Sequence, residues 1–309
     1  MSELGPGLSG GDTFSSVCLH SFSSLLPPSA SFLLLQNPVV PRDKELKECL
    51  YTIIASCATK YEFLEASVSG VVHLIHTKEH AAPHMADLLT QAEDKFSGCP
   101  LVPAVVRDVG RTPMSELARA NGPAKSIAAF LVALSEKLPR QAALQVAVMV
   151  SFLSADSAPM RSAVIALVGN LLVRVYRDRP PVVDERGYGI WLKAKEGLLG
   201  LLLERVKDKG SYVRSKVLMT WSQLCEEKAV PIGHWTEVAR LAIGRLQDKT
   251  PTVRKSALQV IHGATGAKGC VKDAVLCSRQ YGSDWSLQYT RIQKPLWDGQ
   301  SSTGGWRTA

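Results

Sequence analysis

Residues 204–218 read ERVKDKGSYVRSKVL, and residues 244–258 read GRLQDKTPTVRKSAL. Aligned at a spacing of 40, both contain an Arg, an apolar residue, Asp-Lys, Val-Arg and a closing Leu. A weaker copy precedes them, in which Leu153 lies eight positions before Arg161, the spacing that also separates Val206 from Arg214. Self-similarity at a period of about 40 residues is typical of helical repeat proteins.

Each copy predicts two helices joined by a tight turn. We expect Asp208 and Asp248 to accept hydrogen bonds from free backbone N–H groups where the second helix begins. Pro159 and Pro251 fit the first turn of that helix, where a missing N–H costs nothing. A single helix pair cannot bury its own apolar face, so neighbouring pairs must stack. The sequence therefore predicts an all-α fold, a HEAT/armadillo-like α-solenoid of stacked helix pairs.

Outward from these copies, apolar residues recur at three- and four-residue steps, with short breakers between segments of helical length. This pattern predicts the solenoid over residues 45–262. Residues 1–44 are rich in Ser, Gly and Pro and are predicted to be disordered, and residues 263–309 are predicted to form an irregular, disordered tail. Because no further repeat follows, we expect Val253, Leu258 and Ile261 to leave apolar surface exposed.

Composition excludes several classes of protein. The chain has 309 residues, 46% hydrophobic and 21% charged, which is close to the average soluble domain. No apolar run is long enough to span a bilayer, and no basic segment precedes an N-terminal apolar run, which argues against membrane and secreted proteins. Seven scattered cysteines argue against a disulfide framework and for a reducing compartment.

No motif carries convincing chemistry. His76-Thr-Lys-Glu-His80 matches the H-x-x-E-H spacing of some zinc proteases, but it closes an amphipathic helix and is interpreted as a solvated helix end. The cysteines lack close metal-binding pairs, and residues 263–269 only superficially resemble a phosphate loop. We therefore predict no enzyme activity, no cofactor, no metal site and no small-molecule substrate.

Positive charge gathers in the C-terminal half. The net charge is +8, and residues 190–262 carry 13 basic and 7 acidic residues. Such an asymmetry indicates an anionic partner. The candidate DNA-phosphate contacts are Lys207, Lys209, Lys216, Lys249 and Lys255.

The recurring arginines admit two roles. They can pair with the turn aspartates in a ladder between neighbouring repeats, or they can contact the phosphates of duplex DNA. Both roles stay open for Arg161, Arg214 and Arg254, with Asp208 and Asp248 as the ladder partners.

Several blocks, in order and spacing, carry a family resemblance: residues 105–110, 122–131, 136–139, 160–164, 211–218 and 242–249. Over residues 45–262 the chain resembles the N-terminal region of the condensin complex subunit 1 family, the HEAT-repeat non-SMC subunits of condensin. The resemblance implies a non-catalytic scaffold that binds kleisin and SMC subunits and double-stranded DNA or chromatin in mitotic chromosome condensation. It implies a location in the nucleus and on chromosomes, with the interphase cytoplasm as a further location, and no membrane partner. The alternative is a HEAT/armadillo-type protein-interaction adaptor that does not contact DNA.

Overall fold

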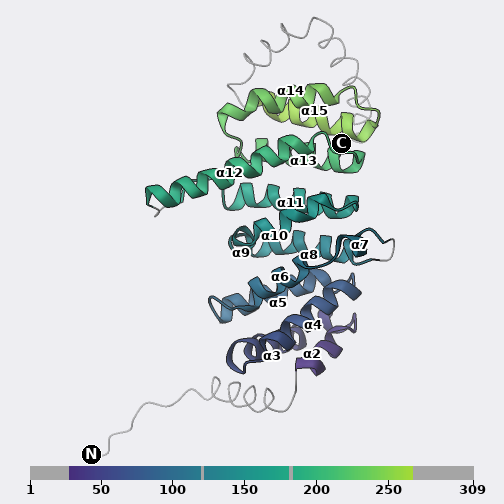
Figure 1. Cartoon of the computed structure of the whole chain (residues 1–309), viewed down its shortest axis with the longest axis vertical. Helices are drawn as coiled ribbons and strands as arrows, with labels where there is room; N and C mark the ends of the chain where they lie inside the picture. Colours follow the sequence, from purple (N-terminus) through teal and green to yellow (C-terminus); the bar gives the residue numbers. More distant parts are fainter. Residues whose placement is uncertain (1–27, 120–121, 181–183, 267–309) are drawn as a thin grey trace, which may run out of the picture. The chain divides into compact units, whose positions relative to one another are not determined.

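The computed structural model describes residues 28–119, 122–180 and 184–266, and in these ranges it contains helices and turns but no strand (Figure 1). The prediction of an all-α, HEAT-like fold of stacked helix pairs is confirmed. The chain divides into two compact units, one up to Val217 and one from Leu218, so that the division falls within α13 (Ser211–Glu226). Each unit is described by itself.

The first unit contains helices α2 to α12 and the start of α13. Their bounds are α2 Pro28–Leu35, α3 Lys44–Lys60, α4 Leu64–Thr77, α5 Ala82–Lys95, α6 Leu101–Gly110, α7 Met114–Leu117, α8 Ala124–Lys137, α9 Pro139–Leu144, α10 Val146–Val150, α11 Ala158–Arg174 and α12 Glu185–Arg205, with 3-10 turns η1 Val40–Arg42 and η2 Ser151–Ser154.

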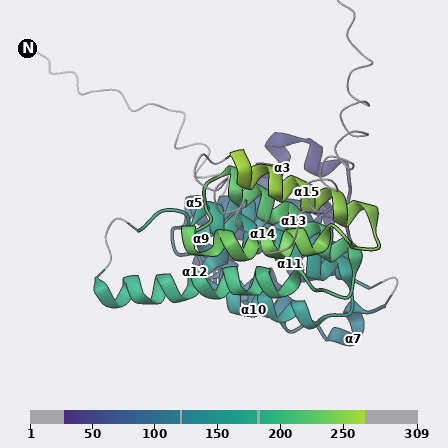
Figure 2. The same cartoon turned by 90° about the horizontal axis from the view of Figure 1, so that it is seen from above.

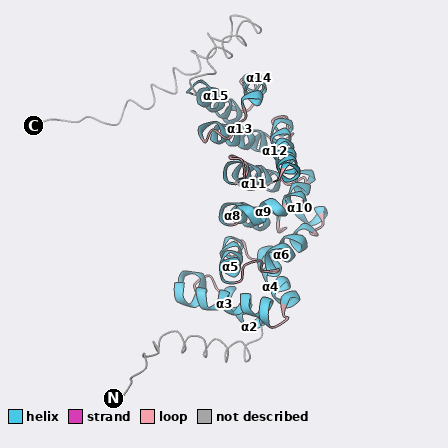
Figure 3. Ribbon diagram, turned by 90° about the vertical axis from the view of Figure 1, so that its left-hand side faces the viewer, coloured by secondary structure: helices cyan, strands magenta, loops and turns pink. Residues whose placement is uncertain are grey.

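These helices form two layers (Figure 3). Helices α3, α5, α8 and α11 pack one after another in the first layer, while α4, α6 and α10 follow one another in the second. Pairs such as α3 with α4 and α11 with α12 join the layers, which is how stacked repeats share one continuous core. Seen from above, α12 extends past the other helices of this unit (Figure 2).

The core of the first unit follows from helical periodicity. In α4, Val68, Val71 and Ile75 recur at helical spacing and are buried, whereas Glu65 is exposed. An apolar stripe of this kind is buried by the neighbouring helices. None of the described helices combines the length and apolarity that crossing a membrane requires.

The prediction of disorder up to residue 44 was wrong for residues 28–44. Helix α2 packs against α3 and α4, with Phe32 and Leu35 buried. The ring of Phe32 lies so close to Gly70 that a Cβ there would be 2.3 Å from it. Ser and Pro in this segment suggested an unfolded chain, but the apolar run gains enough burial to dock. Residues 1–27 lie outside the described residues.

The second unit is smaller. It contains the rest of α13, η3 (Ile232–His234), α14 (Trp235–Arg245) and α15 (Pro251–Gly266), and α14 packs against α15. Helix α15 extends four residues past the predicted end of the solenoid, and residues 267–309, most of the predicted tail, lie outside the described residues. The expectation that Val253, Leu258 and Ile261 leave apolar surface exposed was wrong: they are 0%, 8% and 6% exposed.

The period of 40 residues appears directly in the structure. Helix α12 ends at Arg205 and α14 at Arg245, and residues 201–210 and 241–250 have the same order of helix, turn, buried and exposed positions. As predicted, both turn aspartates cap the next helix: Asp208 Oδ1 accepts from Gly210 N at 2.7 Å, and Asp248 Oδ1 accepts from Thr250 N at 3.0 Å.

Candidate functional site

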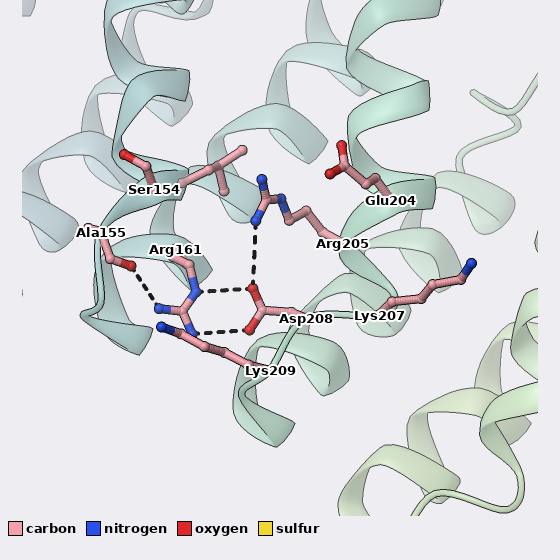
Figure 4. A pocket seen from close by; sticks show the side chains of 9 residues that line it. Ser154, Ala155, Arg161, Glu204, Arg205, Lys207, Asp208 and Lys209 are labelled. Atoms are coloured by element: carbon pink, nitrogen blue, oxygen red, sulfur yellow. Dashed lines mark hydrogen bonds and ion pairs between the residues drawn. The ribbon is translucent and has the colours of Figure 1, made fainter.

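The central feature of the first unit is a buried ion pair between Arg161 on α11 and Asp208 in the turn after α12 (Figure 4). Arg161 Nε donates to Asp208 Oδ2 and Nη2 donates to Oδ1, both at 3.0 Å. The two side chains are only 4% and 2% exposed. This bidentate geometry is that of a strong, charge-assisted hydrogen-bonded pair.

The Nη1 group of Arg161 is also used. Its Nη1 donates to the carbonyl oxygens of Ala155 and Asp156, both at 2.8 Å. The guanidinium therefore ties the turn before α11 to the turn after α12. Such a buried pair is costly to break, because removing one partner leaves the other as a buried charge without its counter-charge.

The arginines at the start of α13 and α15 make a different contact, which is the same in both copies. Arg214 Nη1 donates to the carbonyl oxygens of Asp208 at 2.9 Å and Lys209 at 3.2 Å. Arg254 Nη1 donates to those of Asp248 at 2.8 Å and Lys249 at 3.1 Å. Each of these arginines thus fastens the turn that precedes its own helix.

The five candidate lysines differ in their surroundings. Lys207, Lys249 and Lys255 are exposed, and Lys216 is half-buried. Lys209 is exposed and its Nζ lies 2.5 Å from Asp156 Oδ1; this hydrogen bond and the lysine charge hold the pKa of Asp156 below its usual value. Exposed pairs of this kind are weak, so Lys209 can exchange Asp156 for another anion.

Sequence reasoning missed Arg205 and Arg245 as candidates. They close α12 and α14 one period apart, and Arg205 Nη1 lies 4.0 Å from Asp208 Oδ2 while Arg245 Nη1 lies 3.5 Å from Asp248 Oδ2. Their side chains are 29% and 27% exposed. The sequence feature that could have identified these two arginines is their recurrence at a spacing of 40 residues.

A pocket of about 450 Å³ surrounds the first of these turns (Figure 4). Four cationic and two anionic side chains contribute to its wall. The lining residues are Leu153, Ser154, Ala155, Arg161, Glu204, Arg205, Lys207, Asp208 and Lys209.

The H-x-x-E-H segment does not form a metal site in the described structure. His76 Nε2 lies 3.2 Å from Thr112 Oγ1, burial lowers the pKa of His76, and Glu79 and His80 are exposed. Among the described residues, no three His, Cys, Asp or Glu side chains gather as metal ligands would. His76 is therefore a packing residue between α4 and the turn after α6.

Comparison with known proteins bears on this architecture. The chain is 38% identical over 231 residues to condensin-1 complex subunit CAP-D2 of Arabidopsis thaliana, which covers 75% of this chain and 16% of that protein. It is 25% identical over 248 residues to condensin complex subunit 1 of Xenopus laevis, and 25% identical over 284 residues to that of Homo sapiens. These matches span 16–20% of the relatives' length. No family model matches the chain.

Proposed function

Because 75% of the chain is homologous to condensin complex subunit 1, we propose that it acts as a non-catalytic helical-repeat scaffold in a condensin complex. In this role it binds the kleisin and SMC subunits and double-stranded DNA, and it works in the nucleus on mitotic chromosomes. The homology is the observation that carries the proposal. The helical-repeat fold supports it as well.

Electrostatics support DNA as one partner. The charge of Asp208 is balanced by Arg161, so Lys207 and Lys209 leave the first turn positive. Lys249 and Lys255 are exposed in the second unit, and Asp248 lies beside Arg245. Lysines on flexible stems suit phosphate contacts that follow a duplex without reading its bases.

The DNA part is tested by the salt dependence of binding to a duplex of arbitrary sequence. The test variant is Lys207→Gln/Lys249→Gln/Lys255→Gln, and the matched control is Lys44→Gln/Lys60→Gln/Lys125→Gln, three exposed lysines of the N-terminal half. Each phosphate contact removed should lower the slope of log affinity against log salt by about 0.9. We expect the slope to fall in the test variant alone; equal slopes in all three proteins would refute the DNA surface.

The second candidate is a protein-interaction adaptor without a DNA role, and one observation favours it. A groove of about 420 Å³ lies over α8, α11 and the start of α13 in the first unit. Alanines are the most frequent residues of its wall, and Tyr212, which also lines it, is 66% exposed. An adaptor of this class would keep its protein partner in the triple lysine variant and would not bind duplex DNA at low salt.

A further inference from the structure

The guanidinium of Arg205 lacks a hydrogen-bond acceptor among the described residues. Its Nη1 lies 4.0 Å from Oδ2 of Asp208, a carboxylate whose two oxygens already accept from Arg161. The Nε of Arg205 is shielded from solvent and has no partner. Buried N–H donors of a charged group normally have a hydrogen-bond acceptor. The guanidinium of Arg205 is therefore available to an acceptor from another molecule.

The pocket around Arg205 has the charge of a site for a doubly charged anion. Its wall carries four cations, from Arg161, Arg205, Lys207 and Lys209, and two carboxylates, from Glu204 and Asp208, so its net charge is +2. Arg161 and Asp208 neutralise each other. The cations left for a ligand are Arg205 and the lysines at positions 207 and 209, which are exposed and flexible.

We propose that this pocket binds the phosphoryl group of a phosphorylated serine or threonine side chain on a partner protein. A phosphomonoester carries a charge of about −1.5 to −2 and three acceptor oxygens, which matches both the charge of the wall and the unused donors of Arg205. Leu153 and Ala155 are the apolar residues that line the pocket.

Duplex DNA fits the same pocket less well. Arg205 is recessed, with only 29% of its side chain exposed, and each backbone phosphate of a duplex carries one charge and is flanked by two sugars. Glu204 in the wall and Asp156 beside Lys209 add negative charge that a polyanion would have to approach. A single phosphoryl group at the end of a side chain avoids both obstacles.

The second copy of the turn provides an internal control. Arg245 occupies the position of Arg205, but it lies closer to its aspartate, at 3.5 Å, and Gln247 stands where the first copy has Lys207. Arg245→Gln therefore removes an equivalent arginine from a turn with one cation fewer. The proposal shares Lys207 and Lys209 with the proposed DNA contacts, but it is centred on Arg205 and concerns a different partner, so it can fail while the proposed function stands.

The test is titration of the full chain with N-acetyl-O-phosphoserine methylamide, followed through the side-chain Nε–H resonance of Arg205 by NMR. We expect a saturable shift that is absent with the unphosphorylated serine compound, and binding that weakens as pH falls through about 6, where the phosphate becomes monoanionic. Arg205→Gln should weaken binding at least tenfold, measured by calorimetry, whereas Arg245→Gln should leave it unchanged. Melting temperatures verify that both variants are folded.

Duplex binding by the same variants completes the test. Arg205→Gln is expected to change the affinity for a 20-base-pair duplex by less than about twofold, because a recessed arginine adds little to a surface contact. Unchanged phosphoserine binding in Arg205→Gln would overturn the proposal. A second result would also overturn it: the wild-type chain does not bind phosphoserine, and Arg205→Gln weakens duplex binding. That result would assign the pocket to a DNA phosphate.

Discussion

Arg161 and Asp208 are 47 residues apart in the sequence and meet through two hydrogen bonds of 3.0 Å, out of contact with solvent. The pair joins the start of α11 to the turn after α12, and both of its residues line the pocket around that turn (Figure 4). The hydrogen bonds of the pair fix the turn. Because the charges of Arg161 and Asp208 cancel, the lysines on either side of Asp208 keep their positive charge for a partner.

Arg161→Met should destabilise the protein by about 3–5 kcal/mol, because it leaves the Asp208 carboxylate buried without its partner. Asp208→Asn added to this variant should recover part of the loss, since the amide oxygen still accepts from Gly210 N and no charge is buried. Chemical denaturation measures both effects. The control is Arg111→Met, which breaks the exposed pair with Asp108 and should cost less than about 1 kcal/mol. Equal losses in the two single variants would contradict the buried role.

Gly70→Ala should loosen helix α2, because the added Cβ would come within 2.3 Å of the ring of Phe32. Overpacking of this kind typically costs about 1–3 kcal/mol. Faster amide exchange over residues 28–35 is the expected result. The matched control is Gly197→Ala, also in a helix, where an added Cβ meets nothing within 4 Å; there alanine should stabilise the helix by about 0.5–1 kcal/mol. Unaltered exchange in Gly70→Ala would show that α2 does not dock on α4.

His76 should make folding sensitive to pH. Burial lowers the pKa of His76 below the 6.5 of a free histidine, so the unfolded chain takes up the proton more readily. Well above pH 6.5, His76 is neutral in both states and does not lower the free energy of unfolding. As the pH drops below 6.5, the unfolded chain is protonated first, and the free energy of unfolding falls. His76→Gln should reduce the loss of stability between pH 7.5 and 5.5, while the exposed His80→Gln should not. The same pH dependence in wild type and His76→Gln would refute this assignment.

Arg254 and Lys255 are sequence neighbours with separable roles. Arg254→Met removes two hydrogen bonds to the turn carbonyls and should destabilise by about 1–3 kcal/mol, with duplex affinity unchanged once folding is accounted for. Lys255→Gln should leave stability within about 0.5 kcal/mol and lower the salt slope of duplex binding. Chemical denaturation and duplex-binding isotherms of the two variants test both assignments. Weaker duplex binding at unchanged stability in Arg254→Met, with no effect of Lys255→Gln on binding, would show that the two roles were assigned the wrong way round.

The repeat and its turns were predictable because their causes are local. The capping by Asp208 and Asp248 and the helix ends at Arg205 and Arg245 depend on residues within a few positions. Helix α2 was not predicted, because the Ser, Gly and Pro residues around its short apolar run suggested a disordered segment and its stability comes from distant contacts such as Phe32 with Gly70.

The candidate site was predictable only in part, for the same reason. The sequence indicated that arginines and turn aspartates belong together. It could not indicate that Arg161 would take both oxygens of Asp208, because their separation of 47 positions differs from the period of 40. Once Arg161 holds that carboxylate, Arg205 is left without an acceptor, and this follows only from the three-dimensional contacts.

The most direct test of the account is co-expression of the full chain with the kleisin subunit of condensin, followed by size-exclusion chromatography at physiological salt. A scaffold of the condensin complex should elute with the kleisin in one peak, and the complex should persist in the Lys249→Gln/Lys255→Gln variant, which alters candidate DNA contacts outside the pocket around Arg205. Elution of the two folded proteins in separate peaks would contradict the proposed role.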